Sequence, residues 1–366
     1  MAQFDRDLQQ KEMAIRFCLV NKIIPFLEVN VQNFREISDI STIITDIDTL
    51  GVRIDSSGYI RKVIFDCKTL RNTSPINRAF WASGLMSFTG CNEAFIILRK
   101  KAPEAHRLSA KQIGIHLFDE KQFSNYSESN SIDFRLDYCY STNIHNWVQL
   151  KHSCKGNISL EQFFSFLSND VPIERDSVKS FRKMLIAFRK VQGEFDPAKP
   201  KHRAIYYYGL SVFSYVMSQI IYEFRNIVDF DENAVAFEKV LKYYIWSGKD
   251  SYELRNKLQH LKSNKKFDDT ELELQNWNGF IQLCRNLMDS PSNIPKCINI
   301  LRELSFKQIV DRIPNKDKYL KEQLEHNNRI RQFSSFMSSY IVLTTNLPKD
   351  LNDHLDKEFS TILLET

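Results

Sequence analysis

Glycine is scarce in this chain, with only ten among 366 residues, and this scarcity excludes several kinds of nucleotide site. There is no Gly-x-x-x-x-Gly-Lys-Ser/Thr loop and no Gly-x-Gly-x-x-Gly run, the motifs whose backbone cradles phosphates at the start of a helix. The hydrolase motifs Gly-x-Ser-x-Gly and His-Glu-x-x-His are also absent. We therefore expect no ATP hydrolysis by this chain alone, and any movement along DNA would need a separate ATPase or helicase partner.

The seven cysteines are scattered, with no Cys-x-x-Cys pair and no histidines at zinc-ligand spacing. This pattern excludes an evident zinc site and is typical of a reducing cytoplasm. Long hydrophobic runs are lacking too, because serines, threonines and an asparagine interrupt the apolar stretch 333–347, and Arg16 and Lys22 interrupt the apolar N-terminal segment. We expect no membrane span, no signal peptide and a cytoplasmic location.

Charge of one sign is not in large excess, since the formal net charge is only +5. This value permits nucleic-acid binding without requiring it, so any DNA affinity would have to come from a local patch. A chain of 366 residues that is 43% hydrophobic can bury a large core and favours two domains over one.

Two segments near residue 50 carry the most information. Residues 43–51 (Ile-Ile-Thr-Asp-Ile-Asp-Thr-Leu-Gly) and 63–68 (Val-Ile-Phe-Asp-Cys-Lys) have the composition of strands, and Ser56-Ser57-Gly58 between them has turn chemistry. A hairpin centred on Ser57 places Asp48 opposite Asp66, since each lies nine residues from that centre. The period of two puts Asp66 and Lys68 on one face, with Phe65 and Cys67 on the other.

Two adjacent carboxylates repel each other unless a cation lies between them, and Mg²⁺ with oxygen ligands is a common solution. Such a site suits phosphodiester hydrolysis, because the ion activates water and offsets developing charge while a lysine stabilises the transition state. The pattern Asp48 followed by Asp66-Cys67-Lys68 resembles the PD-(D/E)XK, or restriction-endonuclease-like, nuclease superfamily. Residues 47–51 are similar to the Mrr-like and Holliday-resolvase-like branches.

The resemblance implies a Mg²⁺- or Mn²⁺-dependent nuclease that acts on DNA, with Asp48 as bridging metal ligand and Asp66 as second ligand. The Cys67 carbonyl would be the third ligand, and Lys68 would orient water or stabilise the transition state. Arg71 and Arg78 would lie near substrate phosphates, or would be ordinary surface arginines. A nuclease domain joined to a helical domain also looks like bacterial defence against phage or plasmids.

Family members often add a carboxylate from the preceding helix. Residues 5–27 have helical periodicity, and Glu12 lies on one apolar stripe, where a metal would be one partner for it. The alternative is that Glu12 reaches solvent or Arg16. Glu28, which follows the predicted helix, is the reserve candidate and would need a chain reversal to point at the hairpin.

Further elements follow in the order of an α/β domain. We expect a helix over 77–88, a buried strand over 94–98 and another strand over 113–118. We also expect a loop over 125–130 and a strand over 134–140 that is either an edge strand or pairs with 147–150. The predicted fold is an α/β N-terminal domain with a helix, β-hairpin, strand, helix, strand core of restriction-endonuclease type, followed by a mostly α-helical domain.

From residue 160 onward the pattern is helical, broken at 197–200 and at Pro291, Pro295 and Pro314. We place the boundary near residue 155, giving a nuclease-like domain over 1–155 and a helical domain over 156–366 for partner, dimer or nucleic-acid contact. Tyrosines in this half follow a run of basic residues and could stack on nucleobases. Aromatic residues at helical spacing, however, more often belong to a hydrophobic core. The tyrosines are Tyr206, Tyr207, Tyr208, Tyr215 and Tyr222.

Two readings compete with an active nuclease. A catalytically silent protein with the same fold would act as a binding or scaffold subunit of a complex. Alternatively, Asp46, Asp48 and Asp66 merely solvate an exposed hairpin, in which case no metal would bind. A homodimer is a further possibility, because cutting both DNA strands commonly takes two active sites.

Overall fold

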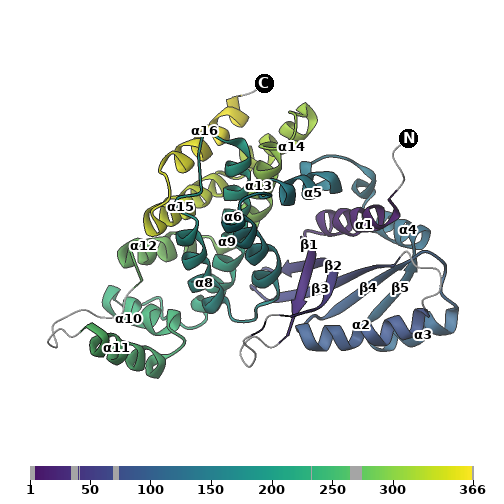
Figure 1. The fold of residues 1–366 in the computed structure, drawn as a ribbon, viewed down its shortest axis with the longest axis horizontal. Helices are drawn as coiled ribbons and strands as arrows, with labels where there is room; N and C mark the ends of the chain where they lie inside the picture. The colour runs from purple at the N-terminus through teal and green to yellow at the C-terminus, as the bar shows by residue number, and fades with distance from the viewer. Residues whose placement is uncertain are drawn as a thin grey trace. The chain divides into compact units, whose positions relative to one another are not determined.

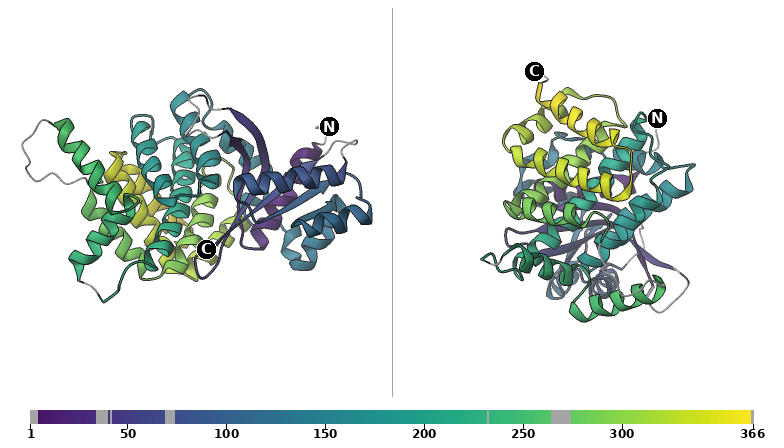
Figure 2. Two further views of the ribbon diagram at one scale, coloured as in Figure 1. Left: turned by 90° about the horizontal axis from the view of Figure 1, so that it is seen from below. Right: turned by 90° about the vertical axis from the view of Figure 1, so that its left-hand side faces the viewer.

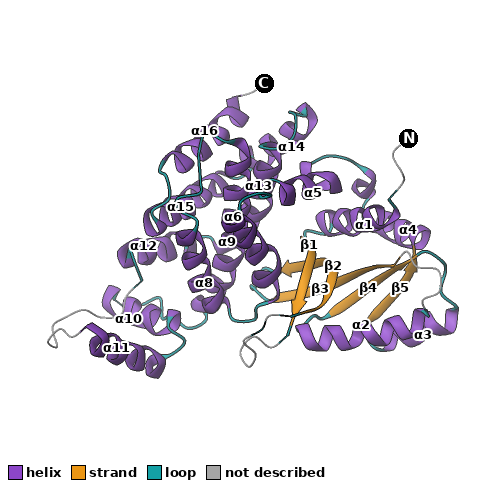
Figure 3. Cartoon of the chain, in the orientation of Figure 1, coloured by secondary structure: helices purple, strands orange, loops and turns teal. Residues whose placement is uncertain are grey.

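A computed structural model describes residues 5–33, 40, 42–68, 74–231, 233–263 and 274–364. The chain forms two compact units, one of Met1–Glu174 with Arg302–Glu322 and the other of Arg175–Leu301 with Gln323–Thr366. The expected boundary near residue 155 falls inside the first unit. Figure 3 shows that the strands are confined to that unit, among helices, and that the rest is helical.

The first unit contains α1 (Arg6–Val20), β1 (Ile24–Gln32), β2 (Ile43–Ile54), β3 (Ile60–Lys68), α2 (Pro75–Thr89), β4 (Glu93–Leu98), α3 (Glu104–Gln112), β5 (Ile115–Asp119), α4 (Glu120–Asn130), the 3₁₀ helices η1 (Ile132–Arg135) and η2 (Tyr140–Thr142), α5 (Ile144–His152), α6 (Ile158–Ser165), the π-helical η3 (Phe166–Asp170) and α7 (Val171–Ile173). The second unit contains α8 (Ser177–Lys190), α9 (Pro200–Arg225), α10 (Ala234–Ile245), α11 (Lys249–Ser263), α12 (Trp277–Met288), η4 (Pro291–Asn293), α15 (Asn328–Thr345) and α16 (Asp350–Leu364). Two helices, α13 (Ile294–Lys307) and α14 (Pro314–Glu325), contain residues of both units.

The sheet has the strand order β1-β2-β3-β4-β5. Its first three strands are antiparallel and its last three are parallel, so the predicted α/β character of the N-terminal region is confirmed. Figure 1 shows α1 and α4 on one face of the sheet and α2 and α3 on the other. In the view from below, α2 lies across the strands (Figure 2, left).

The hairpin forms where the turn chemistry predicts it. The Asp55 carboxylate accepts hydrogen bonds from the backbone N–H groups of Ser57 and Tyr59, at 2.9 and 2.8 Å, and Gly58 adopts a φ of 82°. Because this turn is centred on residue 57, the β2–β3 register pairs Thr49 with Phe65, as the prediction requires.

The predicted division of β3 into two faces is also confirmed. Its odd-numbered side chains, Val63, Phe65 and Cys67, pack with Phe17 of α1 in one buried cluster. The ring centroids of Phe17 and Phe65 lie 5.7 Å apart. The even-numbered Asp66 and Lys68 are left together on the other face.

The predicted helix over 5–27 is too long. Helix α1 ends at Val20, and Lys22 then takes a φ of 56°, so residues 24–27 belong to β1 instead. A proline is tolerated there because β1 is an edge strand. No neighbouring strand of the sheet lies on its outer side to need the backbone N–H that Pro25 lacks. The outer edge is covered in part by η3, since Asn169 accepts the Asn30 N–H at 3.1 Å.

Two further predictions downstream of the sheet are wrong. Residues 125–130 are helical, because Asp119 and Gln122 form a capping box that starts α4 and Phe123 and Ser127 are buried along it. The expected strand over 134–140 is instead the end of η1, an irregular segment over 136–139 and the start of η2, and its expected partner over 147–150 lies in α5.

The chain returns to the first unit at Arg302. There the buried Glu303 carboxylate accepts the N–H groups of Tyr140 and Ser141, so these amides need no strand partner. The Arg302 guanidinium donates to the Pro25 carbonyl at 2.8 Å. Glu303 is distant from these residues in sequence, so a local pattern does not predict this partner for the segment around residue 140.

The second unit is built around α9, which is buried along nearly its full length. Helices α8, α12 and α15 pack against it. The five tyrosines of α9 that could have stacked bases are all interior, at most 6% exposed, which confirms the core interpretation. No helix within the described residues combines the length and apolar character of a membrane span.

Candidate active site

Three carboxylates lie in one row across neighbouring strands. The β1–β2 register is unchanged between Leu27 and Val29, which places Glu28 opposite Asp48. Continued by one residue, the β2–β3 register places Asp48 opposite Asp66. Glu28 has a φ of 52°, a left-handed conformation that a non-glycine residue adopts at a cost of roughly 1–3 kcal/mol.

Two lysines neutralise this row, which we call the acidic row (Glu28, Asp48 and Asp66). The Lys68 Nζ lies 3.5 Å from Asp48 Oδ2 and 3.2 Å from Asp66 Oδ1. The Lys11 Nζ of α1 lies 3.1 Å from Glu28 Oε1 and 3.7 Å from Asp48 Oδ1. The Asp48 and Asp66 carboxylates are therefore close enough to share one cation, and Lys68 lies with them, as the hairpin register predicts.

Asp48 is the central and most tightly held member. It is 5% exposed, and its Oδ2 also accepts the Cys67 N–H at 2.7 Å. Burial raises the pKa of Asp48, with a contribution from the Asp66 charge, although Lys68 and the Cys67 N–H act in the opposite direction. For Lys68, burial acts to lower the pKa, but the Asp66 and Asp48 carboxylates more than offset it and the pKa is raised. Lys68 is thus a protonated ammonium at neutral pH, which can act as a positively charged hydrogen-bond donor but not as a base.

Asp66 has a second cationic partner from α2. The Arg78 guanidinium donates from Nε to Asp66 Oδ2 at 2.7 Å and from Nη2 to Oδ1 at 2.6 Å. Arg78 also stacks on the Trp81 ring, with 3.4 Å between the guanidinium carbon and the ring centroid. This geometry fixes Arg78 and occupies both oxygens of Asp66.

Other predicted site residues lie elsewhere. Glu12 accepts hydrogen bonds from Arg16 Nε at 3.1 Å and from the Ile144 N–H at 3.2 Å. Its carboxylate therefore pairs with Arg16, as the alternative prediction states, and is not part of the acidic row. The Cys67 thiol is buried in the core on the α1 side of the sheet, and the role predicted for the Cys67 backbone carbonyl stays a prediction. Arg71 lies outside the described residues.

Sequence reasoning overlooked Lys11 and gave Glu28 only a reserve place. A signal for Glu28 was present, since Leu27-Glu28-Val29-Asn30-Val31 alternates as an edge strand does. Lys11 is a lone lysine on a mostly buried helix, 6% exposed, and such a charge needs partners. Glu28 and Asp48 come from two strands, β1 and β2, so the sequence pattern could not name them as partners of Lys11.

The donor set can be compared with the needs of Mg²⁺. Carboxylate oxygens from two adjacent strands are the hard ligands that this ion prefers, and one ammonium already spans the two groups. Within the described part of the chain, no three His, Cys, Asp or Glu side chains converge as a metal-binding group. Asp48 and Asp66 have the donor chemistry of a two-carboxylate Mg²⁺ site, and both oxygens of Asp66 are at present held by Arg78 and Lys68.

Comparisons with protein-family models, with curated proteins and with solved structures return no match to this chain. The site must accordingly be interpreted from its own chemistry.

Proposed function

We propose that the chain is a Mg²⁺-dependent nuclease of PD-(D/E)XK type that hydrolyses phosphodiester bonds of DNA. The observation that carries the proposal is the position of the Lys68 ammonium, within 3.5 Å of both Asp48 and Asp66 on adjacent strands of one hairpin. The order of elements supports it, since a helix, an antiparallel three-stranded unit, a helix and a parallel strand follow one another.

Each residue has a role in this proposal. Asp48 and Asp66, with the Cys67 carbonyl, would hold the ion, which when bound supplies charge neutralisation and an activated water. Lys68 remains protonated and donates to the attacking water or to a phosphate oxygen. Lys11 holds Asp48 in place by bridging it to Glu28, so we class Lys11 as a positioning residue.

A second candidate function rests on Arg78. Because Arg78 holds both oxygens of Asp66, the acidic row is already neutralised by protein cations. A catalytically silent protein of the same fold, acting as a binding or scaffold subunit, would keep this arrangement permanently. The two candidates differ in whether a divalent ion can enter.

The test combines cleavage with metal binding. Purified protein is incubated with supercoiled plasmid, labelled single-stranded DNA and labelled RNA in Mg²⁺ or Mn²⁺, with EDTA as a control. Binding of Mn²⁺ is measured in parallel by electron paramagnetic resonance. We expect Lys68→Ala to lower the cleavage rate roughly a hundredfold or more, which is typical for loss of a transition-state donor. We expect Asp48→Asn to abolish metal binding as well.

Lys357→Ala is the matched control, because Lys357 is an exposed lysine on α16, in the second unit. It should retain the wild-type rate. Metal binding without cleavage by the wild type would indicate a nuclease that stays inactive until a partner arrives. Absence of both metal binding and cleavage would refute the metal site and favour the silent scaffold.

A further inference from the structure

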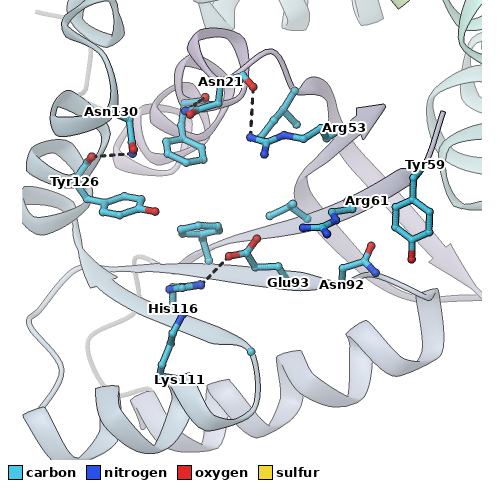
Figure 4. Close-up of a pocket in the computed structure, with 15 residues that line it drawn as sticks. Asn21, Arg53, Tyr59, Arg61, Asn92, Glu93, Lys111, His116, Tyr126 and Asn130 are labelled. Carbon is cyan, nitrogen blue, oxygen red and sulfur yellow. Dashed lines mark hydrogen bonds and ion pairs between the residues drawn. The ribbon is translucent and has the colours of Figure 1, made fainter. Parts of the chain in front are cut away.

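A second site lies on the other face of the sheet. The pocket shown in Figure 4 has a volume of about 600 Å³, within the range of small-molecule sites. It is lined by residues from the C-terminal end of α1 and the turn after it and from β2, β3, β4, α3, β5 and α4, all in the first unit. The proposed function uses none of them.

The pocket carries an excess of positive charge. Its lining includes Arg53, Arg61 and Lys111 but only one carboxylate, that of Glu93. Glu93 is already engaged, because His116 Nε2 lies 2.8 Å from its Oε1. This hydrogen bond lowers the pKa of Glu93, and the charges of Lys111 and Arg53 lower it further against the effect of burial.

Arg53 and Arg61 are placed directly opposite each other in the β2–β3 ladder. Like charges at opposite positions destabilise a strand pair, so this arrangement costs stability in the absence of an anion. Figure 4 shows the Arg53, Arg61 and Glu93 side chains reaching the same open space. The Arg53 guanidinium donates a hydrogen bond to the Asn21 carbonyl at 3.5 Å, and its charge acts on Glu93.

Beside the arginines lies a wall of aromatic rings. Phe95 stacks with His116 at a centroid distance of 4.6 Å, and Phe17 stacks with Tyr126 at 6.0 Å. Phe95 and Phe17 are almost fully buried, at 3% and 5% exposure, and they back the outer rings of His116 and Tyr126, of which Tyr126 is 37% exposed and open to a ligand. Flat rings of this kind stack on nucleobases without demanding a particular base.

Three asparagine amides complete the lining, each fixed by one hydrogen bond. Asn21 donates to the Phe17 carbonyl at 2.8 Å, Asn130 donates to the Tyr126 carbonyl at 3.0 Å, and Asn92 accepts the Lys62 N–H at 2.9 Å. Within the described ranges, the other polar atom of each amide makes no further hydrogen bond. Fixed amides can read the polar edge of a base.

We propose that this pocket binds a nucleotide, with its phosphate between Arg53 and Arg61 and its base against the aromatic wall. Arg53 is five residues from Asp48 along β2, which is roughly 17 Å in a strand and an odd number of positions, hence the opposite face. The pocket is therefore a site separate from the acidic row. The phosphate and base can belong to a free nucleotide or to a nucleotide within a single strand.

The experiment titrates the whole protein with AMP, GMP, inorganic phosphate and a fluorescein-labelled single-stranded oligonucleotide in EDTA, which suppresses metal-dependent cleavage. Calorimetry follows the small molecules and anisotropy follows the oligonucleotide. We expect the Arg53→Ala/Arg61→Ala double variant to weaken binding by roughly tenfold to a hundredfold, since two charged hydrogen-bond donors are lost. Arg331→Ala, which removes an exposed arginine of α15, is the matched control.

A second variant separates binding from folding. Arg61→Glu replaces the opposed arginines with an ion pair, so it should raise the melting temperature while abolishing binding. Saturable binding of AMP or GMP that both pocket variants lose identifies a free nucleotide as the ligand. Binding of the oligonucleotide alone, lost in the same variants, identifies a strand. The proposal is overturned if no nucleotide or oligonucleotide binds, if phosphate binds as tightly as AMP, or if the pocket variants bind as the wild type does.

Discussion

Replacing Arg78 with alanine should destabilise the fold and at the same time tighten Mg²⁺ binding. The Asp66 carboxylate is 4% exposed and the Arg78 side chain 18%, so their two hydrogen bonds are largely shielded from water. Breaking a buried pair by removing one partner costs about 3–5 kcal/mol. Lys68 still lies 3.2 Å from Asp66, and we therefore expect a smaller loss, of about 2–3 kcal/mol.

The same substitution frees both Asp66 oxygens. An ion that binds the wild type must displace charge-assisted hydrogen bonds worth roughly 1.5–3 kcal/mol, and the variant avoids this cost. Removal of the guanidinium charge acts in the same direction. We expect the dissociation constant for Mg²⁺ to fall by roughly tenfold to a hundredfold. Mg²⁺ at ten times that constant should then restore about 1.4 kcal/mol of stability.

The assay is urea unfolding of wild type, Arg78→Ala and the control Arg331→Ala, each with and without Mg²⁺, together with calorimetric titration of Mg²⁺. Rescue by Mg²⁺ should be larger for Arg78→Ala than for either of the other proteins. If a folded Arg78→Ala protein binds Mg²⁺ no more tightly than the wild type, Arg78 is not a competitor for the site. The silent scaffold would then be the better interpretation of the acidic row.

Three further predictions concern individual residues. Glu12→Gln should leave metal binding unchanged, because this carboxylate is paired with Arg16, and a loss of Mn²⁺ affinity in paramagnetic resonance would contradict that assignment. The Lys68 pKa is raised above its ordinary 10.5, so its contribution is present below that pH and is lost as pH rises through the folded-state value. Lys68→Met should accordingly lose less stability than the wild type as the pH rises above about 10.5 in urea titrations, and equal losses would show that Lys68 is not linked to folding. Gly51→Ala would place a Cβ atom 2.8 Å from Ile23 Cγ2 and should cost about 1–3 kcal/mol by overpacking, measured by the urea midpoint, where an unchanged value would refute the close packing.

The sequence by itself determined the centre of the site. Turn chemistry at Asp55 and Gly58 fixes the hairpin register locally, and that register alone places Asp48 beside Asp66. The period of two then assigns Lys68 to the same face. These features depend on residues close together in the chain, so a local pattern was sufficient to predict them.

Tertiary structure decided which other groups reach that centre. The apolar run after Val20 is compatible with a helix or a strand, and only its pairing with β2 brings Glu28 opposite Asp48. Arg78 reaches Asp66 because α2 crosses the sheet there. Arg53 and Arg61 follow from the hairpin register, but the pocket in front of them also needs β4 and α4. Such contacts join residues distant in sequence, and their energies depend on burial and charge in the folded chain, which no local pattern encodes.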